Sequence, residues 1–175
     1  MVDVRILCVT DFRLKRGYRW VWDFVPGNQD EVTFLNTTVR ADHGGWGRRA
    51  GYYGQLMRLG WQALGEVKRG NYDLVVAWEG KGGIPLAFLR QCFGQHQPPL
   101  VILSFSVRGL LKEFTWLWRY GARGVDHFSV PSEAEKRMYG ERLKIPNESI
   151  RHLPLGIHDA FGGAFGKEPG DFVFS

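Results

Sequence analysis

Short apolar runs alternate with helical patterns along this 175-residue chain, and this alternation restricts the folds open to it. Most of the runs are continuously apolar, which is typical of strands buried on both faces of a parallel sheet. They lie at residues 4–10, 32–36, 73–78, 100–105, 126–130 and 150–153. Helical patterns lie between them, at 48–68, 84–93, 110–120 and from Ser132 onward. Right-handed connections between such units predict a three-layer α/β/α sandwich with a mostly parallel sheet.

Local signals refine the expected helices. The helix at 48–68 contains four glycines, Gly51, Gly54, Gly60 and Gly65. Because each of them weakens the helix, we expect close packing against a neighbouring element. Pro85 suits the first turn of the helix at 84–93, where its missing N–H costs nothing. Ser132 and Glu135 have the S-x-x-E spacing of a capping box, which predicts a helix that begins directly after Ser132.

The composition is that of a globular protein, with 44% hydrophobic and 23% charged residues, and it excludes a disordered chain, a collagen-like repeat and a coiled coil. The net charge of +5 favours anionic partners. Cys8 and Cys92 do not form a CxxC motif and the five histidines show no metal-ligand spacing, so we expect a reducing compartment and no metal site. The chain shows neither a signal-peptide pattern nor an apolar stretch of membrane-spanning length, which predicts a cytoplasmic location.

Polar side chains follow several of the predicted strands. In an open parallel sheet, ligands bind beyond the carboxyl ends of the strands. The candidate binding residues at this edge are Asp11, Gly44, Gly45, Glu79, Gly80, Ser104, Ser106, Arg108 and Ser132. For any single one of them, a polar loop is a sufficient explanation, and the capping role is favoured for Ser132.

The sequence gives little support to three common catalytic or nucleotide-binding motifs. Residues 45–50 match the dinucleotide pattern G-x-G-x-x-A, but they do not directly follow a strand, and Glu66 lies inside the helix rather than at a ribose-binding position. Gly80 and Lys81 lack the remainder of a P-loop. Neither a G-x-S-x-G motif nor a plausible Ser/His/Asp order occurs. An NAD-dependent oxidoreductase and a hydrolase are therefore disfavoured.

The segment 13–22 interleaves basic and aromatic residues directly after the first predicted strand. Its members include Arg13, Lys15, Arg16, Arg19, Trp20 and Trp22. This composition suits a contact with an anionic membrane surface or with the phosphate of a lipid-linked acceptor, and it also suits single-stranded nucleic acid. The alternative is a solvated loop whose aromatic side chains fold back on the core.

Three segments carry a resemblance to a known family. They are YDLVVAWEGKGGIPLAFL at 72–89, VDHFSVPSEAEKRMY at 125–139 and IRHLPLGIHDAF at 150–161, and the last is the most specific. The stretch 72–161 that contains them covers about half of the chain and resembles the N-terminal, Rossmann-like half of a GT-B-fold glycosyltransferase, nearest to the retaining family four.

The resemblance implies that two domains bind the two substrates. In that family, a first Rossmann-like domain binds a carbohydrate or lipid-linked acceptor, and a second one binds the nucleotide-sugar and carries an E-x7-E motif. By this resemblance, residues 1–155 form the acceptor-side domain and residues 156–175 form a linker and the first strand of a further domain, with a hinge at Pro154 and Gly156. The E-x7-E spacing occurs only at Glu133 and Glu141, inside the acceptor-side half rather than in a second domain, and Ser104 and Ser106 stand near the position of the family's usual histidine.

The resemblance therefore predicts an acceptor-binding half that is inactive without a donor-binding domain or subunit. The nucleotide-sugar would be a co-substrate rather than a bound cofactor. The alternative is that the chain is a non-catalytic basic α/β module. Such a module would bind an anionic membrane surface, at the inner face of the membrane, or a nucleotide or nucleic acid. No specific nucleic-acid partner is expected.

Overall fold

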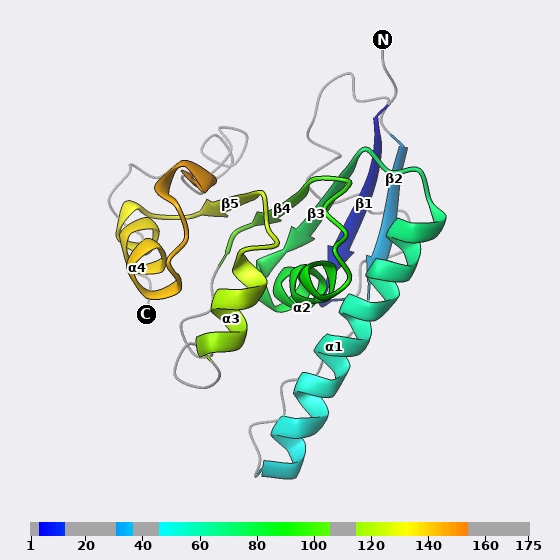
Figure 1. Ribbon diagram of the computed structural model, residues 1–175, viewed down its shortest axis with the longest axis horizontal. Helices are drawn as coiled ribbons and strands as arrows, with labels where there is room; N and C mark the ends of the chain where they lie inside the picture. The colour runs from blue at the N-terminus through cyan, green and yellow to red at the C-terminus, as the bar shows by residue number, and fades with distance from the viewer. Residues whose placement is uncertain (1–3, 13–30, 37–45, 106–114, 154–175) are drawn as a thin grey trace, which may run out of the picture.

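The computed structural model describes residues 4–12, 31–36, 46–105 and 115–153. Within them, six strands form one all-parallel sheet in the order β2-β1-β3-β4-β5-β6 (Figure 1). The strands are β1 (Arg5–Thr10), β2 (Glu31–Asn36), β3 (Leu74–Trp78), β4 (Leu100–Leu103), β5 (His127–Val130) and β6 (Ile150–His152). Each lies within or close to one of the six apolar runs, so the predicted strands and their parallel arrangement are confirmed.

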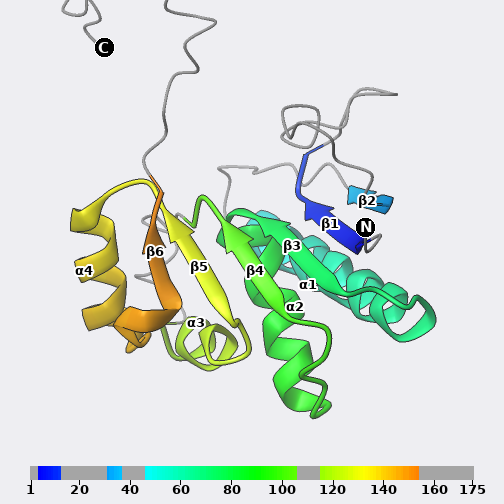
Figure 2. The same cartoon turned by 90° about the horizontal axis from the view of Figure 1, so that it is seen from above.

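Four helices connect the strands: α1 (Trp46–Arg69), α2 (Glu79–Cys92), α3 (Thr115–Ala122) and α4 (Glu133–Leu143). From β3 to β6 the strand order advances in one direction, so right-handed connections place the helices on the same face of the sheet. Contacts between each helix and the next agree with this placement (Figure 2). On the opposite face, Ile6, Cys8 and Val76 are also buried, as the Rossmann-like three-layer sandwich requires.

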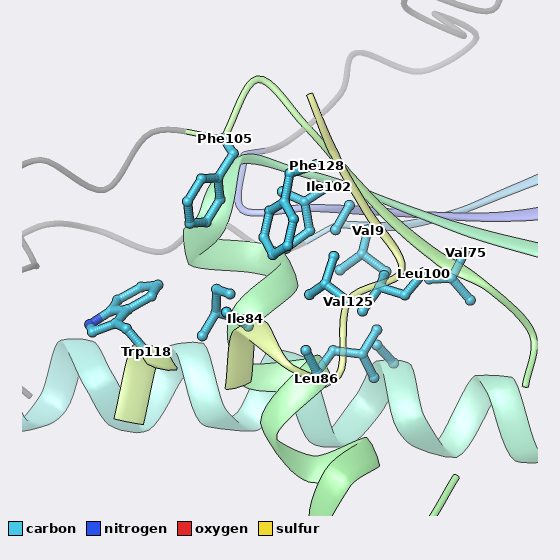
Figure 3. Packing of buried hydrophobic residues seen from close by; sticks show 14 of the residues in the cluster. Val9, Val75, Ile84, Leu86, Leu100, Ile102, Phe105, Trp118, Val125 and Phe128 are labelled. Atoms are coloured by element: carbon cyan, nitrogen blue, oxygen red, sulfur yellow. The ribbon is translucent and has the colours of Figure 1, made fainter. Parts of the chain in front are cut away.

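The core lies between α2 and the sheet. Val9, Val75 and Ile102 point from three adjacent strands toward Ile84 and Leu86 of α2 (Figure 3). Each of these side chains is at most 2% exposed, and such burial stabilises a fold by about 1.5–3 kcal/mol per side chain. The core thereby fixes α2 across the middle of the sheet.

An aromatic group extends this core toward α4. The ring of Phe105, directly beyond β4, packs edge-on against Phe128 of β5 at 4.9 Å and against Tyr139 of α4 at 4.7 Å between centroids. Edge-to-face pairs add about 0.5–1.5 kcal/mol beyond their buried area. The three rings therefore join β4, β5 and α4.

Glycines bring α2 close to its neighbours. A Cβ atom on Gly60 of α1 would lie 2.8 Å from the carbonyl carbon of Pro85, and one on Gly121 of α3 would lie 2.8 Å from Ile84 Cγ2. A Cβ atom on Gly83 of α2 would overlap Ile102 of the sheet. The backbones of α1 and α3 therefore come close to the backbone of α2, and at Gly83 the backbone of α2 lies directly on side chains of the sheet.

The expectation for the glycines of α1 is confirmed at Gly60 and wrong at Gly51 and Gly54. A Cβ atom at either of these two positions would have nothing within 4 Å, and at Gly65 it would meet only Arg69 Nη2, at 3.8 Å. Close packing is needed only where α1 crosses α2. The first turns of α1 lie beyond this crossing.

The predicted start of α2 was wrong. The helix begins at Glu79 rather than at residue 84, and Pro85 lies inside the helix instead of in its first turn. Glycines at positions 80, 82 and 83 argue against a helix by propensity, but all three are buried, and here tertiary packing outweighs propensity. The start of α4 is as predicted: Ser132 is the N-cap, and its Oγ accepts a hydrogen bond from the backbone N–H of Glu135 at 3.2 Å.

A buried arginine fixes the loop between α2 and β4, at the amino edge of the sheet. The Nε atom of Arg90 donates to the carbonyl of Gln95 at 3.0 Å, and its Nη2 atom donates to the carbonyls of His96 and Pro98 at 2.5 and 2.7 Å. Burial lowers the pKa of Arg90, and the nearby carboxylate of Asp126 opposes this shift. Among the described helices, none is long and apolar enough to cross a membrane.

Two alanine substitutions in α1 test the role of the glycine contacts. We expect Gly60→Ala to lower the free energy of unfolding by about 1–3 kcal/mol, because the new Cβ meets the backbone of α2. We expect the matched change Gly54→Ala to raise it by up to about 1 kcal/mol, because alanine is the better helix former and the space there is open. Urea unfolding of both variants measures the difference, and equal effects would contradict the close approach.

Candidate functional site

The first turns of α1 extend past the carboxyl edge of the sheet. The helix has 24 residues and is about 36 Å long, whereas the longest strands have 6 residues and reach about 20 Å. Because α1 leads into the start of β3 at the amino edge, its excess length lies at the other end (Figure 1). Tyr52 and Tyr53, whose rings pack edge-on at 5.6 Å, therefore lie near the carboxyl edge.

Three of the predicted site residues directly follow adjacent strands. Val9 of β1 pairs with Ala77 of β3, and Trp78 of β3 pairs with Leu103 of β4. Asp11, Glu79 and Ser104 are the first residues after β1, β3 and β4, so all three lie at the carboxyl edge, and Asp11 and Glu79 are close enough to interact electrostatically. We call these three residues the Asp–Glu–Ser row.

Two members of this row have an unusual backbone conformation. Glu79 has φ = 58° and Ser104 has φ = 51°, both in the left-handed region that favours glycine. Such conformations cost about 1–3 kcal/mol each and gather at functional sites. At Glu79 the turn leads directly from β3 into α2, so the strained residue lies at the junction between the strand and the helix.

Lys81 and Tyr52 complete the cluster, which we call the edge cluster (Asp11, Tyr52, Glu79 and Lys81). The Nζ atom of Lys81 lies 3.3 Å from Oε2 of Glu79, and the two side chains are 36% and 32% exposed. Asp11 and Tyr52 lie close enough to Glu79 and Lys81 to interact with both electrostatically. With two carboxylates and one ammonium group, the cluster has a surplus of negative charge.

The protonation states follow from this arrangement. Burial, and next the charge of Glu79, raise the pKa of Asp11, while Lys81 opposes the shift. Burial raises the pKa of Tyr52, so its hydroxyl keeps its proton at neutral pH. Burial alone would lower the pKa of Lys81, but Glu79, Tyr52 and Asp11 together raise it, so the ammonium group stays charged.

The edge cluster combines hydrogen-bond donors with acceptors. Lys81 and Tyr52 donate, whereas ionised carboxyl groups accept. The turn beyond β1 is closed by the Oγ1 atom of Thr10, which donates to the carbonyl of Phe12 at 3.0 Å and so fixes the backbone on both sides of Asp11. Neighbouring donors and acceptors suit a ligand whose groups do both, such as the hydroxyls of a sugar.

The structure brings some of the predicted site residues together and separates others. Asp11 and Glu79 lie in the edge cluster, and Ser104 lies beside it in the row. Gly80 is buried in the first turn of α2. Ser132 follows β5, two strands away from β3, and its hydroxyl caps α4. Twelve others lie outside the described residues: Arg13, Lys15, Arg16, Arg19, Trp20, Trp22, Gly44, Gly45, Ser106, Arg108, Pro154 and Gly156.

Sequence reasoning did not select Tyr52 or Lys81 as site residues. The signal for Tyr52 is the length of its helix, which exceeds that of the strands and carries the first turns past the sheet edge. The signal for Lys81 is its position two residues after Glu79 in a helix that starts directly at the strand end. Among the described residues, no group of three or more histidines, cysteines or carboxylates could hold a metal ion.

The parallel sheet and the helices on it define a Rossmann-like domain, with a polar cluster at the carboxyl edge where such folds bind ligands. A sequence model of Glycosyltransferase Family 4 matches residues 4–161, and the chain therefore belongs to this family. The match covers the edge cluster and every described element, and it confirms the resemblance carried by the three sequence segments. A comparison with curated proteins gives no significant match.

Replacement of Glu79 tests the strained backbone. We expect Glu79→Gly to be more stable than Glu79→Gln by about 1 kcal/mol, because glycine relaxes the left-handed φ while both variants remove the charge. Thermal unfolding of the two proteins measures the difference. An equal or lower melting temperature for Glu79→Gly would show that the backbone at this junction is unstrained.

The raised pKa of Asp11 predicts a pH-dependent effect on stability. The native state holds this proton more tightly than the unfolded state, so the aspartate destabilises the fold as the pH rises above its unfolded pKa of about 3.9. We therefore expect Asp11→Asn to melt at a higher temperature than the unmodified protein at pH 7. The gain should vanish below about pH 4, where both side chains are uncharged. A stability gain that is the same at every pH would contradict this environment for Asp11.

Proposed function

We propose that this chain is the acceptor-binding half of a glycosyltransferase. In this proposal the edge cluster binds a carbohydrate, free or lipid-linked, and presents one of its hydroxyls for transfer of a sugar from a nucleotide-sugar. The observation that carries the proposal is the position of the Asp–Glu–Ser row at the carboxyl edge of the sheet, in a chain that belongs to glycosyltransferase family 4.

The proposed roles follow from charge and hydrogen-bonding capacity. Asp11 and Glu79 accept hydrogen bonds from acceptor hydroxyls, while Lys81 and the hydroxyl of Tyr52 donate to acceptor oxygens. The surplus of carboxylates disfavours a phosphate within the edge cluster itself. A lipid-linked acceptor would therefore place its sugar hydroxyls here and its phosphate elsewhere.

The proposed reaction breaks the bond between the anomeric carbon of the donor and its phosphate oxygen, and it forms a bond from that carbon to the acceptor oxygen. The nucleotide leaves with the bonding electron pair, and its phosphate oxygen takes up the proton that the acceptor hydroxyl loses. The sheet edge supplies one wall of the cleft in which both substrates must be held close together. We infer that a donor-binding domain, in the same chain or in a partner, supplies the other wall.

Binding to an array of immobilised oligosaccharides tests the acceptor site directly. We expect the chain to bind a subset of glycans, and Asp11→Asn and Glu79→Gln each to weaken this binding about 10- to 100-fold, which is the effect of losing one hydrogen bond to a charged group. The matched control is Glu133→Gln, an exposed carboxylate at the start of α4 that lies 3.4 Å from His152. Absence of glycan binding, or an equal loss in the control, would overturn the proposal.

A second assay separates acceptor binding from transfer. Release of nucleotide from a panel of nucleotide-sugars, with the bound glycan as acceptor, should stay at background for this chain alone. It should rise when a donor-binding domain is added. Turnover by this chain alone would show that it is more than an acceptor-binding half.

A further inference from the structure

The exposed face of α1 carries basic and aromatic side chains in one stripe. Arg58, Trp61 and Lys68 are three and seven residues apart, so they share a face of the helix, and all three are exposed. Trp61 is 57% exposed, and its ring packs edge-on against Phe93, which is 52% exposed, at 5.5 Å. The Nζ atom of Lys68 lies 5.1 Å from the centre of the Phe93 ring.

A second stripe of the same kind lies on α3, which packs against α2 as α1 does. Trp116 and Tyr120 of α3 and Arg123, which follows the helix, are four and three residues apart and are also exposed. Trp116 is 65% exposed, the highest value among the exposed large hydrophobic side chains of the described residues. The ring of Tyr120 packs edge-on against Phe88 of α2 at 5.4 Å, so this stripe is joined to α2.

The charge of this helical layer is strongly one-sided. Among the described side chains of α1, α2 and α3, four exposed cations remain once the buried Arg90 and Lys81 of the edge cluster are set aside: Arg58, Lys68, Arg69 and Arg119. The one carboxylate of this layer outside the edge cluster, Glu66, is paired with Arg69 at 2.7 Å, whereas α4 contains three basic residues and three carboxylates. Within the described part of the chain, neither Arg58 nor Lys68 has a carboxylate within ion-pair distance.

We propose that this aromatic–basic surface (Arg58, Trp61, Lys68, Phe93, Trp116 and Tyr120) docks on an anionic lipid bilayer. Tryptophan and tyrosine favour the boundary between headgroups and acyl chains, and each arginine or lysine near an anionic surface adds to the attraction. Because arginine and aromatic residues are also enriched in protein interfaces, binding to a second copy of the chain is kept as an outcome of the test.

The inference is independent of what the edge cluster binds, because it depends on the outer side of the helices and not on the sheet edge. It also differs from the membrane contact expected for residues 13–22, which lie outside the described residues. Because α1 and α3 both pack against α2, the distance between the two stripes is already fixed in the protein without a membrane.

Co-sedimentation with vesicles tests the proposal. The full chain should bind vesicles of phosphatidylcholine with about one-third phosphatidylglycerol, and it should bind much less to phosphatidylcholine alone or in high salt. Arg58→Glu and Lys68→Glu should each weaken binding to the anionic vesicles roughly tenfold. The matched control is Arg137→Glu, which makes the same charge change at an exposed position of α4 and should leave binding nearly unchanged.

Two aromatic variants test the insertion of side chains. Trp61→Ser and Trp116→Ser should each lower vesicle binding several-fold and reduce quenching of tryptophan fluorescence by brominated lipids, with an unchanged melting temperature because both side chains are exposed. Equal binding to both vesicle types, or an equal loss in Arg137→Glu, would overturn the proposal. Self-association that Trp61→Ser abolishes, in a chain that does not bind vesicles, would assign the surface to a second copy and would overturn it as well.

Discussion

The close packing of α2 on the sheet is the constraint on which the rest of the structure depends. At Gly83 the backbone of α2 lies directly on the side chains of Ile102 and Ala77, and Gly60 and Gly121 bring α1 and α3 close to the backbone of α2. With α2 this near to the strands, the chain must turn from β3 into the helix within one residue. That residue is Glu79, and its left-handed φ is the consequence.

The same constraint assembles the candidate site. The abrupt junction holds Glu79 and Lys81 at the carboxyl edge, where Asp11 directly follows the neighbouring β1. The overlong α1, fixed to α2 at Gly60, carries Tyr52 to the same place. Packing in the interior thus determines which polar groups meet at the edge, although none of these groups lies in the core.

Charge is distributed differently over the two regions for which binding is proposed. The carboxyl edge has a surplus of carboxylates, which suits a ligand rich in hydroxyls. The outer side of α1 and α3 has exposed cations and aromatic rings, which suits an anionic surface. The net charge of +5 is a sum over the whole chain, so it could not indicate where an anionic partner would bind.

Much of the fold could be predicted from the sequence, because the apolar runs and the helical spacing between them are local signals. The six strands, their parallel arrangement and the cap at Ser132 follow from such signals, whereas the order of the strands in the sheet was not predicted. The start of α2 could not be predicted, because its first turns contain three glycines, which have low helix propensity. Only the structure shows that all three are buried by tertiary packing. Of the site, Asp11 and Glu79 were found from strand ends, whereas Tyr52 required knowledge of how far α1 extends past the edge.

The most direct test of the central claim is a titration of the isotopically labelled chain, followed by amide NMR, with a soluble oligosaccharide that it binds. The account predicts that the largest shifts occur at Asp11, Tyr52, residues 79–81 and Ser104, around the Asp–Glu–Ser row. Shifts confined to α4 and β6, or to the outer side of α1 and α3, would contradict the assignment of the carboxyl edge as the acceptor site.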